Sequence, residues 1–350
     1  MKTVLVINPG STSTKLALAE DGQLVRTTVI AHTAETLGRS GSVWEQLPER
    51  LEQCHAWIDE HVHACDAIVA IGGLLRPLAG GTYRVNTAMI DDAKAGVQGQ
   101  HASNLGCAIA DVFAAEFGCP AFVVDPVSVD EFEPLAYYSG HPRIRRRSLS
   151  HAISLHAAAR RAAAERSVAL EQSSFVIAHL GGGISVAAVR GGRIIDVNDA
   201  ASDGPFSPDR TGGLPLQEFI TLSRSDGMTE SDVRSFVMGR GGLVAYIGTN
   251  SVVEAESRAR EGDAGAEEVL DAMAYQIAKE IGAMSAVLEG RLDAIVLTGG
   301  VARSATITGR IDRRVRWIGP VLIYPGDDEM TALAQGAFRV FDGTETALEY

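Results

Sequence analysis

The sequence lacks the features that mark disulfide-rich and membrane-spanning proteins. It has four cysteines in 350 residues, Cys54, Cys65, Cys107 and Cys119, and no two of them form a CxxC pair. This spacing is not that of a disulfide framework, so we expect reduced thiols that serve as small apolar residues. No run of eighteen apolar residues occurs, so no transmembrane helix is expected.

Positive charge is also scarce. Lys and Arg number 31 against 44 Asp and Glu, which gives a net charge of −13. Such an acidic chain is poorly suited to bind nucleic acid or anionic membranes. The first ten residues, MKTVLVINPG, are typical of a strand and a turn and lack the apolar region of a secretion signal. We therefore expect a cytoplasmic protein with no nucleic-acid or membrane partner.

The chain does contain an internal repeat. Residues 6–25 and 176–195 align without a gap, and each consists of an apolar strand, a turn of small residues and further apolar strands. Hairpin tips built from Gly, Ser and Thr offer backbone N–H groups and hydroxyls to phosphate oxygens without side-chain bulk. The repeat predicts a duplicated fold that grips a polyphosphate between its halves, and this length suits two domains.

Strands and helices alternate along the chain, which predicts an α/β fold with a largely parallel sheet covered by helices. We place the domains at 1–150 and 151–350, because the alanine-rich segment 150–168 is typical of a helix and is expected to link the halves. The other predicted helices are 43–63, 102–117 with Ser103 as its cap, 265–289 and 329–340, and the predicted strands are 67–69, 121–124, 294–297 and 321–324.

The first hairpin tip follows Asn8 and reads PGSTSTK. It is not a Walker loop, because that motif opens a helix and this segment opens a strand. A plain hairpin turn needs only one or two small residues, whereas this run is longer, so we expect phosphate contacts. The candidate nucleotide-binding residues here are Ser11, Thr12, Ser13, Thr14 and Lys15.

The second hairpin tip consists of Gly181, Gly182 and Gly183. Three consecutive glycines allow a phosphate to approach the backbone, although a loose hairpin tip would look the same. His179 precedes them at a strand end, where it is either a site residue or a hydrogen-bonded structural histidine. Gly299-Gly300, after the strand 294–297, is a candidate nucleoside platform with a weaker signal, because many strands end in two glycines.

Two charged residues are candidates for the chemistry. Asp125 ends an apolar strand, where α/β sheets bind ligands, and it is either a Mg²⁺ anchor or a helix cap. Arg210 lies in the loop DGPFSPDRTGGLP, which could fix a guanidinium against a transferring phosphoryl group or leave it in solvent. The cluster His61, His63 and Cys65 is not expected to bind metal, because residues two apart on a helix face apart. The basic run 143–147 is expected to be a surface feature.

These motifs together resemble the acetate kinase group of the acetate and sugar kinase, Hsp70 and actin superfamily, and within it the chain is similar to butyrate kinases. The matching blocks span nearly the whole chain in order: INPGSTSTK, GGTYRVN, HASNLG, DPVSVDEF, HLGGGIS, GPFSPDR, GGLVAYIGTN, AMAYQIAKEIGA, LTGG and YPGDDEM. The resemblance implies duplicated ribonuclease H-like (actin-like ATPase) domains with the active site in the cleft between them.

The resemblance also implies an activity. Butanoate or a similar short or branched-chain acid would attack the γ-phosphorus of ATP in line and reversibly, with Mg²⁺, to give an acyl phosphate and ADP. Asn8 would contact the transferring phosphate, and His179 and Arg210 would stabilise its equatorial oxygens. Asp125 and Glu329 would hold the metal. A homo-oligomer is expected.

One position departs from the family pattern. The family has Arg-Gly-Gly where this chain has Ile71-Gly72-Gly73, and that arginine would meet the substrate carboxylate or the phosphoryl group. An arginine in this role is worth about 10³–10⁵ in rate. Either Arg76 or Arg84 substitutes for it, or the substrate differs, or the protein is a weakened or inactive nucleotide-binding relative.

Overall fold

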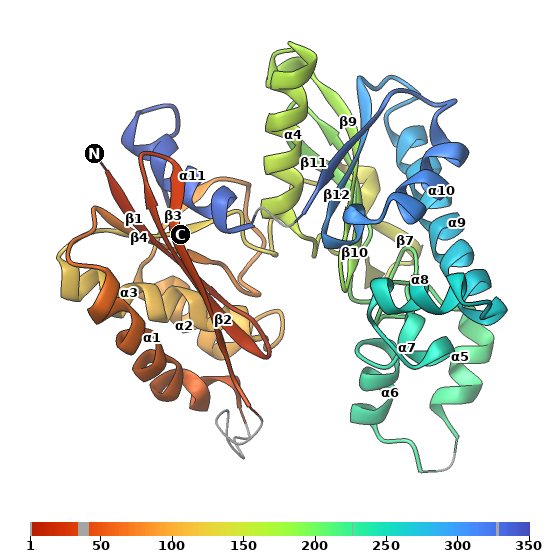
Figure 1. Cartoon of the computed structure of the whole chain (residues 1–350), viewed down its shortest axis with the longest axis horizontal. Coiled ribbons are helices and arrows are strands. Elements are labelled where there is room, and N and C mark those ends of the chain that lie inside the picture. The colour runs from red at the N-terminus through yellow and green to blue at the C-terminus, as the bar shows by residue number, and fades with distance from the viewer. Residues whose placement is uncertain (1, 34–41, 226, 327–328) are drawn as a thin grey trace. The chain divides into compact units, whose positions relative to one another are not determined.

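The computed structural model describes residues 2–33, 42–225, 227–326 and 329–350 (Figure 1). The chain forms two compact units. The first unit contains the described residues up to 130 together with those from 329 onward, and the second contains residues 131–326. Each unit is built around a β-sheet of its own.

The first unit contains a sheet of seven strands among its described residues, in the order β14-β5-β6-β4-β1-β2-β3. β1, β4 and β6 run parallel, and β2 and β3 extend the sheet from β1 as an antiparallel meander. The strand bounds are β1 Thr3–Pro9, β2 Ser13–Glu20, β3 Gln23–Ala31, β4 Ala67–Ile71, β5 Thr82–Arg84, β6 Ala121–Val124 and β14 Leu348–Glu349.

Helices cover this sheet. Their bounds are α1 Leu47–His61, α2 Thr87–Ala95, α3 Gly106–Phe117 and α11 Glu329–Phe341, with 3₁₀ turns at Val43–Gln46 and Ala102–Leu105. Asn86 caps α2 by accepting a hydrogen bond from the N–H of Met89. The predicted cap at Ser103 is wrong, because Ser103 lies inside the 3₁₀ turn and His101 accepts the hydrogen bond from its N–H. The core contains apolar residues of β1, β2, β4, α1 and α3.

The second unit contains a sheet of five strands in the order β11-β10-β9-β12-β13, and a separate hairpin of β7 and β8. Its strands are β7 Tyr138–His141, β8 Ile144–Arg145, β9 Ser174–Leu180, β10 Ile184–Arg190, β11 Arg193–Val197, β12 Ala294–Gly299 and β13 Val321–Pro325. Its helices are α4 Ala152–Arg166, α5 Leu216–Ser223, α6 Glu230–Val237, α7 Gly242–Ile247, α8 Val252–Arg260, α9 Ala264–Val287 and α10 Ala305–Val315. α9 buries the predicted apolar stripe, including Met273, Ile277 and Ile281, in the core of this unit.

The two sheets share one topology, which confirms the predicted duplication. In the first unit the order β3-β2-β1-β4-β6 is an antiparallel meander followed by two parallel strands. In the second unit the order β11-β10-β9-β12-β13 repeats it. β5 and β14 are additions on the outer edge of the first sheet. The two predicted hairpin tips therefore occupy equivalent places, at the turns β1–β2 and β9–β10.

The units divide the chain elsewhere than at the predicted residue 150. Residues 131–150 belong to the second unit, where Arg146 forms an ion pair of 2.9 Å with Asp196 beside β11. α4, predicted as a link between halves, packs on β9 and β12 within that same unit. The end of the chain returns to the first unit, because α11 packs on β1 and β4 and β14 pairs with β5.

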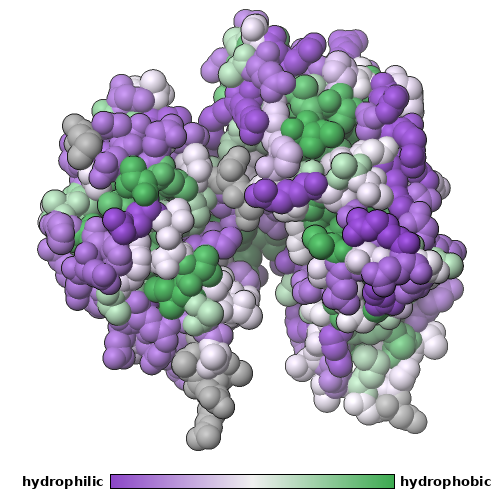
Figure 2. Space-filling model, in the orientation of Figure 1, coloured by the Kyte–Doolittle hydropathy of each residue, from purple (hydrophilic) through white to green (hydrophobic). Residues whose placement is uncertain are grey.

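On the face shown in Figure 2, each unit is predominantly hydrophilic, with apolar residues in separate patches. This agrees with the excess of acidic residues in the sequence. Within the described ranges, we find no helix with the length and apolar character needed to cross a membrane.

Candidate active site

Three of the predicted site residues lie at the carboxyl edge of the first sheet. β1 and β4 are paired as far as Ile7 and Ala70, so Asn8 and Ile71 are the next residues at this edge. β4 and β6 are paired as far as Ile71 and Val124, and Asp125 follows directly. Since ligands bind at the carboxyl ends of parallel strands in α/β sheets, Asn8 and Asp125 occupy the expected place for a site.

Asn8 is joined to the start of α11. Its Nδ2 donates a hydrogen bond of 3.0 Å to Oε2 of Glu329, the first residue of that helix. The two residues are 321 positions apart in the sequence. A carboxylate is also stabilised in the first turn of a helix, where the helix dipole is positive. The structure therefore places Glu329 at the same edge as Asn8.

Asp125 is held in a strained conformation. Its side chain is fully buried and its φ is +41°, in the left-handed region that non-glycine residues seldom adopt. Oδ1 accepts a hydrogen bond of 2.7 Å from the N–H of Gly81, and the N–H of Asp125 donates to the carbonyl of Gly81 at 3.0 Å. Strain of this kind costs about 1–3 kcal/mol and is concentrated at functional sites.

Asp125 and Glu329, the residues predicted to hold Mg²⁺, follow or face the carboxyl ends of strands in the same sheet. This ion binds in proteins through one or two carboxylates together with substrate phosphates and water. The described residues contain no group of three or more His, Cys, Asp or Glu side chains suited to a metal ion. A cation here would consequently depend on phosphate oxygens to complete its coordination.

Ile71, Gly72 and Gly73 lie at this edge, but packing alone accounts for both glycines. A Cβ on Gly72 would lie 2.3 Å from Cβ of Pro126. A Cβ on Gly73 would lie 2.3 Å from Oδ1 of Asn104, the atom that accepts the N–H of Leu74. Ile71 is buried, with 8% of its surface exposed.

The two arginines considered as substitutes at position 71 are held elsewhere. Arg76 is ion-paired with Asp92 and lies over the ring of Tyr350. In the pairing of β5 with β6, Arg84 lies opposite Phe122, two residues before the end of β6. Its Nε lies 3.6 Å from Oε1 of Glu349. Both side chains thus have their partners outside the row formed by Asn8, Ile71 and Asp125.

The first hairpin tip is a tight turn closed by a 2.7 Å hydrogen bond from the N–H of Gly10 to the carbonyl of Ser13. Ser11 and Thr12 are exposed, and Ser13 and Lys15 are partly exposed. Thr14 differs from the prediction, because its side chain is buried and its hydroxyl contacts His32 Nε2 at 2.8 Å. The available hydroxyls of this tip are thus at residues 11–13.

His101 is a residue near this tip that the motif reading did not select. Its Nε2 lies 3.4 Å from Oγ of Ser11, and its Nδ1 contacts Oγ of Ser103 at 2.8 Å. The only sequence signal was its place in the block HASNLG, because the contact joins segments 90 residues apart.

The second sheet places its predicted residues at the corresponding edge. His179 of β9 is in register with Thr298 of β12, so the tip 181–183 and the turn at Gly299 lie side by side. Gly299 has φ +91°, and a Cβ there would lie 2.5 Å from the carbonyl oxygen of Leu180. The backbone at position 299 therefore requires a glycine. Gly300 is exposed, and nothing lies within 4 Å of the position of its missing Cβ.

Arg210 lies against the glycine tip. A Cβ on Gly183 would be 2.4 Å from Nη1 of Arg210, which explains why this position carries no side chain. Nη1 donates to the carbonyl of Ala200 at 2.8 Å, and burial lowers the pKa of the guanidinium. The loop is anchored to the tip by Ser207, whose hydroxyl donates to the carbonyl of Gly182. Arg210 is thus fixed at the tip and is not a solvated surface residue.

His151 also belongs to this group, and the sequence reading missed it. Its ring stacks on that of His179 with centroids 4.1 Å apart and an interplanar angle of 17°. Nδ1 contacts Oγ of Ser185 at 2.8 Å. Burial, followed by the neighbouring His179 and Arg210, holds the pKa of His151 well below its usual value. His151 is therefore neutral in the folded protein at ordinary pH.

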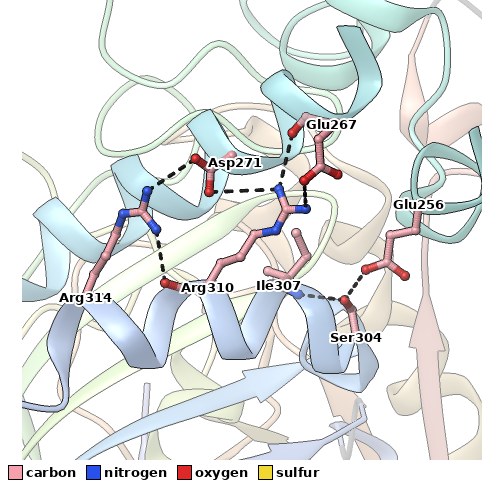
Figure 3. Close-up of polar contacts among 7 residues, drawn as sticks. All are labelled: Glu256, Glu267, Asp271, Ser304, Ile307, Arg310 and Arg314. Carbon is pink, nitrogen blue, oxygen red and sulfur yellow. Dashed lines mark hydrogen bonds and ion pairs between the residues drawn. The ribbon is translucent and has the colours of Figure 1, made fainter. Parts of the chain in front are cut away.

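Polar contacts join α10, which follows the turn after β12, to α8 and α9 (Figure 3). Ser304 caps α10 by accepting the N–H of Ile307 at 2.9 Å, and its hydroxyl donates to Glu256 of α8. Arg310 of α10 donates to Glu267 of α9 at 2.6 Å. These contacts fix the start of α10, and with it the exposed turn at Gly300.

The two discounted clusters have ordinary structural contacts. The ring of His61 stacks on Trp57, and its Nδ1 contacts the carbonyl of Trp57 at 2.8 Å. Arg147 forms an ion pair of 3.0 Å with Asp199.

Known proteins resemble the chain over its full length. The Acetokinase family matches residues 133–322. A probable butyrate kinase of Listeria monocytogenes serotype 4a (strain HCC23) is 48% identical over 351 residues, which cover 99% of each chain. A probable butyrate kinase 2 of Caldanaerobacter subterraneus subsp. tengcongensis is 48% identical over 353 residues, which cover 100% of each chain.

A solved structure has the same fold. The crystal structure of Porphyromonas gingivalis acetate kinase gives a TM-score of 0.79 at 17% identity, covering 97% of this chain and 99% of that one. Likeness at that identity concerns the fold alone, and it confirms the fold class predicted from the motifs.

Proposed function

The chain belongs to the acetokinase family, and on that premise we propose that it is a carboxylate kinase. It transfers the γ-phosphoryl group of ATP to butanoate or a similar short-chain acid, reversibly, and forms an acyl phosphate and ADP. The observation that carries the proposal is the identity of 48% to probable butyrate kinases along the whole chain. The row of Asn8 and Asp125 and the fixed guanidinium of Arg210 supply the chemistry that this reaction needs.

The reaction requires no general base. A short-chain carboxylate is already ionised at neutral pH, since carboxyl groups have pKa values near 4. One of its oxygens forms a bond to the γ-phosphorus while the bond from that phosphorus to the bridging oxygen of ADP breaks. Catalysis then consists of positioning the reactants and stabilising charge on the phosphoryl oxygens.

The residues of the first unit would bind the metal and orient the phosphoryl group. Mg²⁺ would be held by Asp125 and Glu329, and it neutralises charge on the β- and γ-phosphates when bound. Asn8 would donate to a phosphoryl oxygen from the position that its contact with Glu329 defines. The hydroxyls and amides of residues 11–13 would contact phosphate.

The residues of the second unit would stabilise the transferring group and hold the nucleotide. Arg210 would place its guanidinium on the equatorial oxygens, and a fixed arginine in this role is worth about 10³–10⁵ in rate. His151, which is neutral, and His179, which stacks on it, would donate hydrogen bonds to the phosphoryl oxygens. Gly182 and the exposed Gly300 would lie against the nucleotide.

Ile71 makes the first-unit edge more apolar than the family pattern. A buried isoleucine contributes no charge at the position where the pattern has arginine. We therefore propose that the chain is a slow kinase with butanoate. We also propose that it self-associates, because Leu135, Tyr138 and Ile144 expose large apolar side chains on one short segment of the second unit. Light scattering tests this last point.

A carboxylate panel tests the proposed activity. The protein is mixed with ATP, Mg²⁺ and acetate, propionate, butanoate or a branched-chain acid, and acyl phosphate is trapped with hydroxylamine. We expect hydroxamate with at least one of these acids and none without ATP. If no acid in the panel gives hydroxamate while ATP still binds, the protein is a nucleotide-binding relative and the proposal is wrong.

A further inference from the structure

Arg50 of α1 is a buried cation that the proposed reaction does not use. None of its surface is exposed, and it is among the largest fully buried side chains of the protein. Nη1 donates to Oγ1 of Thr14 at 3.1 Å, and Nε and Nη2 donate to Oε1 of Gln46 at 3.2 and 3.0 Å. These partners are a hydroxyl and an amide, and both are neutral.

No carboxylate compensates this charge among the described residues, where Arg50 forms no ion pair. Burial lowers the pKa of the guanidinium, and burial followed by the guanidinium lowers the pKa of the neighbouring His32. A buried ion loses its hydration, and hydrogen bonds to neutral groups replace that hydration only in part. An apolar or amide side chain could join α1 to β2 without burying a charge. We therefore look for a role of the charge itself.

The position of Arg50 relates it to the first hairpin tip. Thr14, which it holds, directly follows Ser13, and the carbonyl of Ser13 closes the tip by accepting the N–H of Gly10. Directly after β3, His32 contacts the same Thr14 hydroxyl at 2.8 Å, and its N–H donates to the carbonyl of Thr12 at 2.8 Å. The cluster of Arg50, His32 and Thr14 thus fixes the hairpin immediately beside its exposed hydroxyls.

We propose that Arg50 is a positioning residue for phosphate binding: it fixes the Thr14 side of the hairpin and supplies a positive charge behind the tip. The inference rests on the proposed function, in which this tip contacts the phosphates of ATP. A cation in a buried, poorly polarisable environment interacts with an anion more strongly than one in water. The contribution should therefore grow with the number of phosphates on the ligand.

The test compares Arg50→Met with the natural protein by calorimetric titration of ATP, ADP and adenosine in the presence of Mg²⁺. Methionine keeps most of the length of the side chain and removes its charge. We expect the Kd for ATP to rise about tenfold, the Kd for ADP to rise less, and the Kd for adenosine to stay unchanged. Arg50→Lys, which restores the charge without the planar fork, should recover part of the loss.

Arg26→Met is the matched control, because it removes one arginine charge from an exposed position on β3 of the same unit. It should leave all three Kd values unchanged. In steady-state assays, Arg50→Met should raise the KM for ATP and leave the KM for the acid unchanged. If Arg50→Met does not fold, Thr14→Val removes the hydroxyl that Arg50 contacts and keeps the charge. This variant should also weaken the binding of ATP more than the binding of adenosine.

Two results would overturn the inference. An equal loss for ATP and adenosine, or a lower melting temperature with unchanged ATP affinity, would show that Arg50 only supports the fold. Failure of the natural protein to bind ATP is a different result, because it contradicts the proposed function itself.

Discussion

The β1–β2 hairpin of the first unit and the β9–β10 hairpin of the second have the same strand arrangement. They differ in where a positive charge lies beside the tip. In the first unit the tip presents Ser11, Thr12 and Ser13, and the guanidinium of Arg50, which contacts Thr14, is buried behind the hairpin. In the second unit the tip is three glycines, and Arg210 lies directly against Gly183. One hairpin is equipped to bind through its own hydroxyls, while the other leaves space for an arginine supplied by a loop.

This difference shows what the duplication preserved. Strand order and hairpin geometry are the same in both units, because they follow from apolar alternation and short turns that both segments contain. The polar residues around the tips are not equivalent, since each cation comes from a different element. The fold therefore fixes where the two tips lie, and local substitutions decide which element supplies a cation beside each tip. Four experiments test this comparison, from the largest expected effect to the smallest.

Removal of the loop cation should have the largest effect. Arg210→Met should lower kcat by about 10³, because a fixed arginine on the transferring group acts mainly in the transition state. The loop should stay in place, since Ser207 anchors it to Gly182 independently of this side chain. Turnover is measured by hydroxamate formation, with Arg193→Met as a control at an exposed position on β11. A loss below tenfold would mean that Arg210 has a structural role only.

The glycine tip can be tested with a matched pair of alanine variants. A Cβ on Gly183 would lie 2.4 Å from the guanidinium of Arg210, whereas a Cβ on Gly182 would lie 3.4 Å from the nearest atom, Oδ2 of Asp209. Gly183→Ala should displace the guanidinium by about 1 Å and lower kcat about 100-fold. Gly182→Ala should have a much smaller effect on kcat. Equal effects of the two substitutions would contradict the assigned contact.

The missing arginine at the first-unit edge is tested by restoring it. Ile71 ends β4 beside Asn8, and the two nearby arginines considered as substitutes are engaged elsewhere. Ile71→Arg should raise kcat with butanoate about tenfold, by neutralising charge on the reacting groups. Ile71→Met is the control for the change in side-chain shape. If the natural protein already turns over at about 1–100 s⁻¹, as ordinary kinases do, the position does not limit the rate.

The smallest effect concerns pH. Burial, together with Arg50 in one case and with His179 and Arg210 in the other, lowers the pKa of His32 and His151. Each histidine therefore binds a proton less readily when folded than when unfolded, where its pKa is about 6.5. The free energy of unfolding should therefore fall as the pH falls below 6.5, by at most about 1.4 kcal/mol per pH unit for each histidine.

Urea unfolding between pH 7.5 and 5.5 measures this slope. The variants His32→Gln and His151→Gln should each show a smaller decrease than the natural protein. An unchanged slope in either variant would mean that the pKa of the corresponding histidine is the same in the folded and unfolded states.

The sequence predicted the parts of this molecule that depend on neighbouring residues. Both hairpin tips, the strand ends at Asp125 and Gly299, and α9 follow from local apolar patterns and turns. The inward side chain of Thr14 could not be assigned, because the register at the tip decides which strand residues face the core. His151 and Arg50 were missed for a related reason, since their contacts join segments far apart in the chain. The return of α11 to the first unit likewise left no local signal.

The most direct test of the account is hydroxamate trapping of acyl phosphate from ATP, Mg²⁺ and butanoate, run in parallel on three proteins. These are the natural chain, Asp125→Asn of the first unit and Arg210→Met of the second. The account predicts acyl phosphate from the natural chain, and at least about 100-fold less from each variant, because the proposed reaction uses both Asp125 and Arg210. Equal rates in the three proteins, or no acyl phosphate above background from the natural chain with any short-chain acid, would contradict it.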